Sequence, residues 1–434
     1  MTPTNDKLHL TSARGSVDYD FGVAGKVYLY DGPSKAILQP RAIHTFSDGK
    51  MLCAASSELL QTTYLIMLDE RGVIDEAFGE AGKCRFKVPD YFPCMKFGQP
   101  FALEYDDKLQ KIVMGFYAAG DIYTPWLGAA RFDFNGSLDP TFGVGGVMVC
   151  EYDLNSEKLA ALSSGDNCIE SPSALGYSPS MVVMEDGSIM FSSLLTILFT
   201  YTVLTRVDCD GVLDKSFGGR GFVIVEHKNR STRTEDLIRQ GEKVLLAANS
   251  SMQWEGEWFA GRYNADGSLD ERFATNGYYD TFLGVKSCLL WNEDEKELYI
   301  LGTSANTAGQ HLYVLVQRTG VDGQEDPHYG KRGWGTAFGS FIGQTVIWHA
   351  ALYNPGSTIV LAGHVVFNSN DKRTVIGSIE QDMGWDGEFG NEGLVILDGE
   401  VVVHALAVQA DRKVVYISSV NNAPDSFSIN RLHG

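Results

Sequence analysis

The sequence predicts an all-β fold, a seven-bladed β-propeller with four-stranded antiparallel blades and a ring closed by the two termini. Three observations lead to this prediction. One glycine-bounded motif recurs seven times among the 434 residues. Each interval between copies contains four short apolar stretches separated by turn-forming residues. The chain also starts close to one copy of the motif and ends on a stretch that elsewhere leads into it.

The motif places an Asp, an aromatic residue and a Gly at fixed offsets, as in GSLDPTFGVGG from Gly136. The copies begin at Gly15, Gly72, Gly136, Gly211, Gly267, Gly323 and Gly384. The acidic positions are Asp18, Asp75, Asp139, Asp214, Asp270, Asp326 and Asp386. The aromatic positions are Phe21, Phe78, Phe142, Phe217, Phe273, Tyr329 and Phe389. The closing glycines are Gly25, Gly82, Gly146, Gly221, Gly277, Gly333 and Gly393.

Each motif residue has a structural interpretation. The Asp is expected to accept hydrogen bonds from nearby backbone amides in a tight turn. The aromatic ring is expected to fill the space between neighbouring blades, and the closing Gly to adopt a backbone conformation that other residues avoid. A Ca²⁺ site would need six to eight oxygens, and each copy supplies one regular carboxylate. We therefore predict a structural motif and no metal site.

The spacing of the copies indicates an array of supersecondary units. Successive motif aromatics lie 57, 64, 75, 56, 56 and 60 residues apart. Length alone would suggest two to four domains, but seven such units assign residues 1–434 to one propeller domain. Residues 187–205 carry no charge and have the length of a membrane span. Their many β-branched and polar residues favour two buried strands, which we place third and fourth in one blade.

The two ends of the chain are expected to share a blade. The final stretch, FSINRLHG, matches the strand that precedes the motif in other intervals, and the N-terminal motif has no such strand before it. Joining these two segments would remove the open edges of the ring.

The pattern D-G-x-L-D-x-x-F-G-x-x-G, repeated about every sixty residues, resembles the bacterial delta-60 repeat family of β-propellers. An arginine stands five residues before the motif Gly in four copies, as in that family: Arg131, Arg206, Arg262 and Arg318. Met67 and Ile379 replace it in two others. The resemblance covers essentially the whole chain. It implies a propeller of bacterial type and no single activity.

Composition excludes several classes of function. The net charge of −20 argues against a nucleic-acid binder, because neutralising phosphates needs a basic surface. The seven cysteines include no C-x-x-C pair, and the nine histidines show no metal-ligand spacing. No nucleotide-binding loop or nucleophile motif occurs either, so no cofactor and no catalytic residue are predicted. Without an apolar segment at the start, the expected location is cytoplasmic, with leaderless secretion as the alternative.

Two groups of residues are candidates for ligand binding. In the repeat register, Arg41, Trp348 and His404 align at the start of the second strand of their units. If that strand borders the central channel, they could meet at its mouth, although ordinary polar strand ends would explain them too. The second group lies in aromatic, turn-rich segments: Tyr123, Trp126, Trp254 and Trp258. Such rings suit protein or sugar contacts, or they pack over blade edges.

The functional expectation is a non-enzymatic interaction scaffold that presents one propeller face to a protein or a glycan. The alternative is a carbohydrate-active hydrolase or lyase with its site at the mouth of the central channel. An enzyme should bring several acidic or histidine side chains with shifted pKa values into a deep pocket. A binding module should instead present a shallow aromatic patch.

Overall fold

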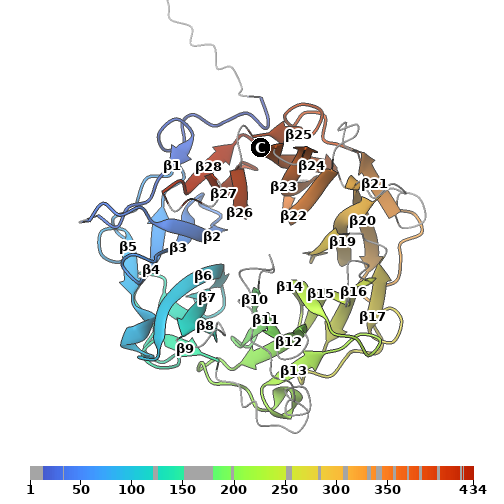
Figure 1. Cartoon of the computed structure of the whole chain (residues 1–434), viewed down its shortest axis with the longest axis horizontal. Coiled ribbons are helices and arrows are strands. Elements are labelled where there is room, and N and C mark those ends of the chain that lie inside the picture. The colour runs from blue at the N-terminus through green and yellow to red at the C-terminus, as the bar shows by residue number, and fades with distance from the viewer. Residues whose placement is uncertain are drawn as a thin grey trace, which may run out of the picture.

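Seven four-stranded antiparallel sheets are arranged in a ring, which confirms the predicted seven-bladed β-propeller (Figure 1). This computed structural model describes residues 13–32, 34–120, 126–150, 179–196, 200–250, 257–281, 285–305, 311–329, 334–338, 345–354, 358–368, 371–380, 384–397, 401–420, 423 and 425–434. Within these ranges the blades are numbered 1 to 7 in the order in which their innermost strands occur in the chain.

The innermost strands surround the axis of the ring (Figure 1): β2 (Gln39–Thr45), β6 (Met95–Asp106), β10 (Ser180–Val183), β14 (Arg233–Gln240), β18 (Val285–Asn292), β22 (Thr345–Asn354) and β26 (Val401–Val408). The second strands are β3 (Met51–Ser57), β7 (Lys111–Gly120), β11 (Ile189–Thr196), β15 (Lys243–Ser250), β19 (Glu297–Ala305), β23 (Thr358–Asn368) and β27 (Val414–Val420). The third strands are β4 (Thr62–Leu68), β8 (Trp126–Asp133), β12 (Thr200–Val207), β16 (Glu257–Tyr263), β20 (His311–Gly320), β24 (Asp371–Glu380) and β28 (Ser428–Leu432). The outermost strands are β5 (Lys83–Phe86), β9 (Val147–Val149), β13 (Phe222–Val225), β17 (Tyr278–Thr281), β21 (Trp334–Phe338), β25 (Leu394–Ile396) and β1 (Lys26–Val27).

The hydrophobic core lies between the blades. All seven residues of β3 and all seven of β4 are buried, because a blade is covered by a neighbour on each face. This is why these strands are continuous apolar runs instead of alternating patterns. The ring centres of Phe86 in blade 1 and Phe116 in blade 2 lie 6.0 Å apart in one shared cluster. The same buried side chains therefore hold neighbouring blades together.

Each sheet includes the short strand that follows its motif. For example, β5 pairs with β4 across the motif of Asp75, with Cys84 opposite Leu65. The strand we counted first in each sequence unit is therefore the outermost strand of the preceding blade. Residues 187–205 do form two strands, β11 and β12, but these are the second and third of their sheet. The predicted placement as third and fourth strands was wrong for this reason.

Helix is nearly absent from the part of the chain that the structure describes. It contains the short 3₁₀ turns η1 (Val88–Asp90) and η3 (Phe217–Gly219). None of its helices has the length and apolarity needed to cross a membrane.

The two ends of the chain complete blade 7. β1 pairs with β28, with Lys26 opposite Asn430 and Val27 opposite Ile429. Three further backbone bonds extend this seam, including Asp18 N to Arg431 O at 3.0 Å. The N-terminal segment thus supplies the outermost strand to three C-terminal strands, as the sequence predicted.

Candidate functional site

The motif Asp uses both carboxylate oxygens within the fold. In all seven copies one oxygen accepts the amide two residues further on, at 2.9 to 3.3 Å. The other oxygen faces a cation, which is an arginine of the preceding strand in five copies: Arg131 with Asp139, Arg206 with Asp214, Arg262 with Asp270, Arg318 with Asp326 and Arg431 with Asp18. Where that arginine is missing, Lys50 lies 2.8 Å from Asp75 and Arg14 lies 2.6 Å from Asp386.

The motif aromatic lies between this arginine and the next blade. The guanidinium of Arg431 lies 4.5 Å from the ring centre of Phe21, and Arg131 lies 4.7 Å from that of Phe142. On the next blade, a Cβ built on Gly72 would stand 2.7 Å from the Phe21 ring. The ring therefore packs against the first glycine of the following copy, which explains why no side chain occupies that position.

Backbone hydrogen bonds join the same seams. The amide after the motif aromatic donates to a carbonyl of the next blade at 2.7 to 2.8 Å in the six seams described: Gly22 to Arg71, Gly79 to Asn135, Gly143 to Asp210, Gly218 to Asp266, Ala274 to Asp322 and Gly390 to Arg14. Six of the closing glycines have φ between 81° and 101°, and Gly333 lies outside the described residues. The motif therefore joins neighbouring blades. We call the motif Asp, the cation that pairs with it and the motif aromatic of one seam a fastener.

Sequence reasoning missed the fifth arginine of the fasteners. Arg431 follows the same local pattern as Arg131, an arginine before a buried apolar residue on the third strand. The Asp with which it pairs, Asp18, lies 413 residues before it in the chain. A search of the residues that directly precede each motif therefore does not find Arg431. The pattern itself was present, and only the closed ring pairs it with Asp18.

The innermost strands carry a repeated irregularity in their pairing with the second strand. Six of them skip a residue there, which marks a β-bulge, and β6 skips a further one at Lys96. The residues of the repeated bulge are Arg41, Phe101, Glu235, Lys286, His349 and His404. A bulge redirects a side chain relative to its sheet, and this position recurs around the ring axis.

Two of the three predicted channel residues lie together. Arg41 Nη1 is 3.4 Å from His404 Nδ1, across the boundary between blades 1 and 7. Burial, followed by the charge of Arg41, lowers the pKa of His404 to about 3, so this imidazole is neutral near pH 7. Trp348 lies in β22, one residue before the bulge at His349, and not at the bulge itself.

The two predicted aromatic residues that the structure describes, Trp126 and Trp258, lie on different blades. Trp126 is half-buried against the core shared by blades 1 and 2. Trp258 is 6% exposed in the core of blades 4 and 5, which leaves its ring little surface for a ligand. Tyr123 and Trp254 lie outside the described residues.

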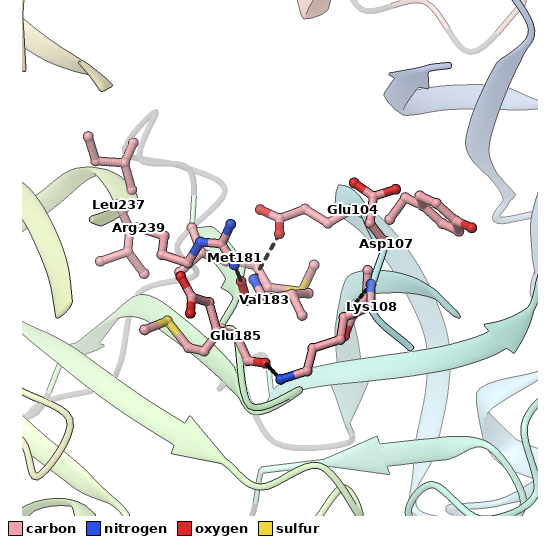
Figure 2. Close-up of a pocket in the computed structure, with 13 residues that line it drawn as sticks. Glu104, Asp107, Lys108, Met181, Val183, Glu185, Leu237 and Arg239 are labelled. Carbon is pink, nitrogen blue, oxygen red and sulfur yellow. Dashed lines mark hydrogen bonds between the residues drawn. The ribbon is translucent and has the colours of Figure 1, made fainter. Parts of the chain in front are cut away.

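A cavity of 580 Å³ opens where the innermost strands of blades 2, 3 and 4 end (Figure 2). Its charged lining combines four carboxyl groups with two cations: Glu104, Asp106, Asp107, Glu185, Lys108 and Arg239. Lys108 Nζ donates to the Glu185 carbonyl at 3.1 Å, and Arg239 Nη1 donates to the Val183 carbonyl at 3.3 Å. The cavity is therefore built from polar groups that already bridge adjacent blades.

Glu104 is the most perturbed group of this cavity. Burial raises the pKa of its carboxyl to about 7, while the Val183 amide, which donates to Oε2 at 2.8 Å, opposes the rise. A second carboxylate does the same two blades further on, since Asp236 Oδ2 accepts the Leu289 amide at 2.9 Å. Both side chains satisfy an edge amide of the next innermost strand, which a sheet edge would otherwise leave unpaired.

Aromatic rings form a cluster beside this cavity, which we call the rim cluster: His44, Phe46, Tyr105 and Phe134. Phe46 packs edge-on against Tyr105 and Phe134, with centroids 5.4 and 5.5 Å apart. Tyr105 also lines the cavity, and Phe134 is 45% exposed. The sequence did not single these rings out, because they come from the strand ends and turns of two blades and meet only in the fold.

A buried histidine on blade 4 connects a serine and an aspartate. His227 Nδ1 lies 3.2 Å from Ser250 Oγ, and Nε2 lies 2.9 Å from Asp280 Oδ1. The imidazole stacks on Phe259 with centroids 4.2 Å apart, and burial lowers its pKa. Ser250 has no exposed surface and also donates to the Glu257 carbonyl at 3.2 Å. The hydroxyl is thus positioned as a buried structural link and not as an accessible nucleophile.

Metal ligands are not clustered in the described parts of the chain, where no three His, Cys, Asp or Glu residues converge. The cysteines that the structure describes are free thiols, and burial raises the pKa of Cys84 to about 11.

No family model matches the chain, and no curated protein matches it. Among solved structures, Drosophila Semaphorin 2a is similar over 97% of this chain and 76% of its own, with 9% identity and a TM-score of 0.46. The β-propeller domain of the Trilobed protease from Pyrococcus furiosus is similar over 92% of this chain and 93% of its own, with 10% identity and a TM-score of 0.46. A prolyl endopeptidase is similar over 92% of this chain and 48% of its own, with 10% identity and a TM-score of 0.49.

Proposed function

We propose that the protein is a non-enzymatic binding scaffold that holds a segment of a protein partner in the cavity of Glu104 and on the adjacent rim cluster. The observation that carries this proposal is the continuity of the two surfaces through Tyr105, which belongs to both. An exposed ring beside a charged hollow suits a segment with one apolar and one charged side chain.

Charge favours a basic partner. The cavity lining has four carboxyl groups against two cations, and the whole chain has a net charge of −20. Such a field attracts cations and accelerates their association. The partner segment we expect therefore carries a Lys or Arg for the cavity and an apolar residue for Phe134.

The enzymatic alternative, a carbohydrate-active hydrolase or lyase, would assign the raised pKa of Glu104 to proton transfer. Asp236 makes the same kind of contact with the Leu289 amide, which supports a structural reason for the position of the Glu104 carboxyl. Glu104 accepts the Val183 amide of the next innermost strand at 2.8 Å, so this carboxyl already has a role in holding two blades together. The structural role therefore supports a scaffold over an enzyme.

We also propose membership of the delta-60 repeat propellers. Seven motif copies support it, because the motif Asp accepts the same backbone amide in every copy and pairs with the strand Arg in five of them. If a profile of the seven repeats did not align with the repeats of that family, the proposal would fail.

Selection of a random peptide library on the immobilised full chain tests the binding proposal. We expect enriched peptides that pair a basic with an aromatic or aliphatic residue, and at least tenfold weaker binding to Phe134→Ser and to Asp107→Lys. Tyr19→Ser is the matched control, because Tyr19 is a 70% exposed aromatic within the motif of blade 7, away from the cavity. Peptides that bind all variants alike would contradict the assigned site. Binding confined to a glycan array would contradict a protein partner, and sugar release lost in Glu104→Gln would establish an enzyme.

A further inference from the structure

Arg41 is a half-buried guanidinium whose identified partners are neutral. In the amide orientation that satisfies both groups, Gln99 Oε1 lies 3.3 Å from Nε and 3.3 Å from Nη2. Gln39 Oε1 lies 3.5 Å from Nη2, and His404 Nδ1 lies 3.4 Å from Nη1. The side chain also lies over the Phe427 ring, 4.8 Å from its centre. Burial lowers the pKa of Arg41, and no carboxylate of the described residues forms an ion pair with it.

A half-buried arginine without a carboxylate partner is unusual among the described residues of this protein. The five fastener arginines and Arg14 each pair with a motif Asp. Burying an uncompensated charge is costly, and a protein with 55 acidic residues could easily supply a partner. At Arg41 the fold instead supplies an imidazole and two amides.

The protonation state of His404 follows from its neighbours. A guanidinium only donates hydrogen bonds, so Nδ1 of His404 must be the unprotonated nitrogen. Nε2 then carries the proton and donates to Ser419 Oγ at 2.7 Å. The ring is held by stacking on Phe427, with centroids 4.7 Å apart. His404 therefore adds no positive charge to the site and fixes one edge of the guanidinium.

Arg41 has more hydrogen-bond donors than the described residues around it have close acceptors. A guanidinium has five N–H groups in a fixed fork. Gln99 accepts from Nε and from one N–H of Nη2, and His404 accepts one N–H of Nη1. The remaining N–H of Nη1 has no acceptor among the described residues, and that of Nη2 has only Gln39 at 3.5 Å. Each of the two terminal nitrogens, Nη1 and Nη2, therefore retains one N–H without a close acceptor among the described residues, and donors on both nitrogens can bind the two oxygens of one carboxylate.

We propose that Arg41 is the anchor of a carboxylate-binding site on the innermost wall of the ring, with His404 and Gln99 as its positioning residues. The site lies toward the beginning of β2, whereas the cavity of Glu104 lies where the innermost strands end, so the two sites are separate. One positive charge beside a neutral imidazole matches a singly charged carboxylate, whereas a phosphate dianion would need a second cation. Two sources can supply such a carboxylate, a small organic acid and an acidic polypeptide.

Titration of the ¹⁵N-arginine-labelled full chain tests the proposal through the Nε–H resonance of Arg41. At constant ionic strength, with NaCl as the balancing salt, sodium acetate should shift this resonance in a saturable manner and sodium phosphate should bind more weakly. The peptide acetyl-Gly-Glu-Gly-amide, compared with its Gln counterpart, distinguishes the sources. Tenfold tighter binding than acetate identifies a polypeptide carboxylate, and equal binding identifies a free acid.

Two variants and one control complete the test. Arg41→Gln should lose carboxylate binding, and Arg41→Lys, which keeps the charge without the fork, should bind at least tenfold more weakly. Arg71→Gln should bind as the unaltered chain does, because Arg71 is a 70% exposed surface arginine. Saturable shifts that persist elsewhere in Arg41→Gln, a tighter phosphate than acetate, or no response above the NaCl control would each overturn the proposal. Circular dichroism of the variants establishes that they are folded.

Discussion

Arg431 Nε donates to Asp18 Oδ2 at 2.9 Å, which joins two residues 413 positions apart in the chain. Both side chains are buried, at 4% and 2% exposure, inside the sheet that the two termini share. The bond repeats the fastener of the other blades, but it is the one that closes the ring.

Removing one partner of this pair should destabilise the protein strongly. We expect Arg431→Met to lower the free energy of unfolding by about 3–5 kcal/mol, because it leaves the Asp18 carboxylate buried without its main counter-charge. Urea denaturation followed by circular dichroism measures the change. Arg206→Met is the control and should cost about 1 kcal/mol, since its pair with Asp214 is 14% and 22% exposed. The double variant Arg431→Met with Asp18→Leu should recover most of the loss. Equal losses for Arg431→Met and Arg206→Met would contradict the role of burial.

The first glycine of each motif should be intolerant of any side chain. At Gly72, φ is 80° and a Cβ would meet the Phe21 ring at 2.7 Å. We expect Gly72→Ala to cost about 3 kcal/mol, from left-handed backbone strain and from overpacking together. Gly241→Ala isolates the backbone contribution, because φ there is 61° and a Cβ meets nothing within 4 Å. That control should cost about 1 kcal/mol. Thermal unfolding of both variants gives the comparison, and similar losses would argue against ring contact across the seam.

The fasteners should also make stability depend on acid. Burial raises the pKa of Asp270, but the hydrogen bond from Lys243 and the charge of Arg262 outweigh it and bring the pKa to about 2. Because the ordinary pKa is 3.8, this carboxylate stabilises the fold above pH 3.8, and its contribution is lost as the pH falls toward 2. Asp270→Asn should cost about 2 kcal/mol at pH 7 and flatten the acid dependence of the unfolding free energy between pH 4 and 2. Asp20→Asn, at an exposed carboxyl within the motif of blade 7, is the control and should leave that dependence unchanged.

Glu104 should show the opposite pH dependence. Its pKa of about 7 lies above the ordinary 4.5, so the folded chain keeps a proton that the unfolded chain releases, and stability falls as the pH rises from 4.5 to 7. Glu104→Gln keeps an acceptor for the Val183 amide and should raise the unfolding free energy at pH 8. We expect about 1–2 kcal/mol, because the side chain retains contact with solvent in the cavity. At pH 4 the change should vanish. Glu185→Gln, exposed in the same cavity, is the control, and a destabilised Glu104→Gln at pH 8 would exclude this account.

The fold was predictable because its information is local and repeated. Every copy of the motif carries the Asp, aromatic and Gly that one seam needs, so the number of copies predicted the number of blades. The repeat register also places Arg41 and His404 at equivalent positions, and the two side chains are in contact in the structure. Trp258 illustrates the opposite case, since the local sequence of an aromatic residue near turn formers does not distinguish a ring that packs inward from one that faces solvent. The rim cluster could not be predicted either, because Phe46, Tyr105 and Phe134 share no spacing and meet only through the angle between two blades.

Blade 7 has a consequence for the order of events during synthesis. Its outermost strand, β1, is made first, and β28, the strand it pairs with, is made last. While the ribosome is still translating, the segment from Gly15 to Val27 has no sheet to join, and six blades can assemble only as an open arc. The ring can therefore close only once β28 has been made and has left the ribosome. A chain that stops before Ser428 would leave both ends of the arc exposed to chaperones and proteases.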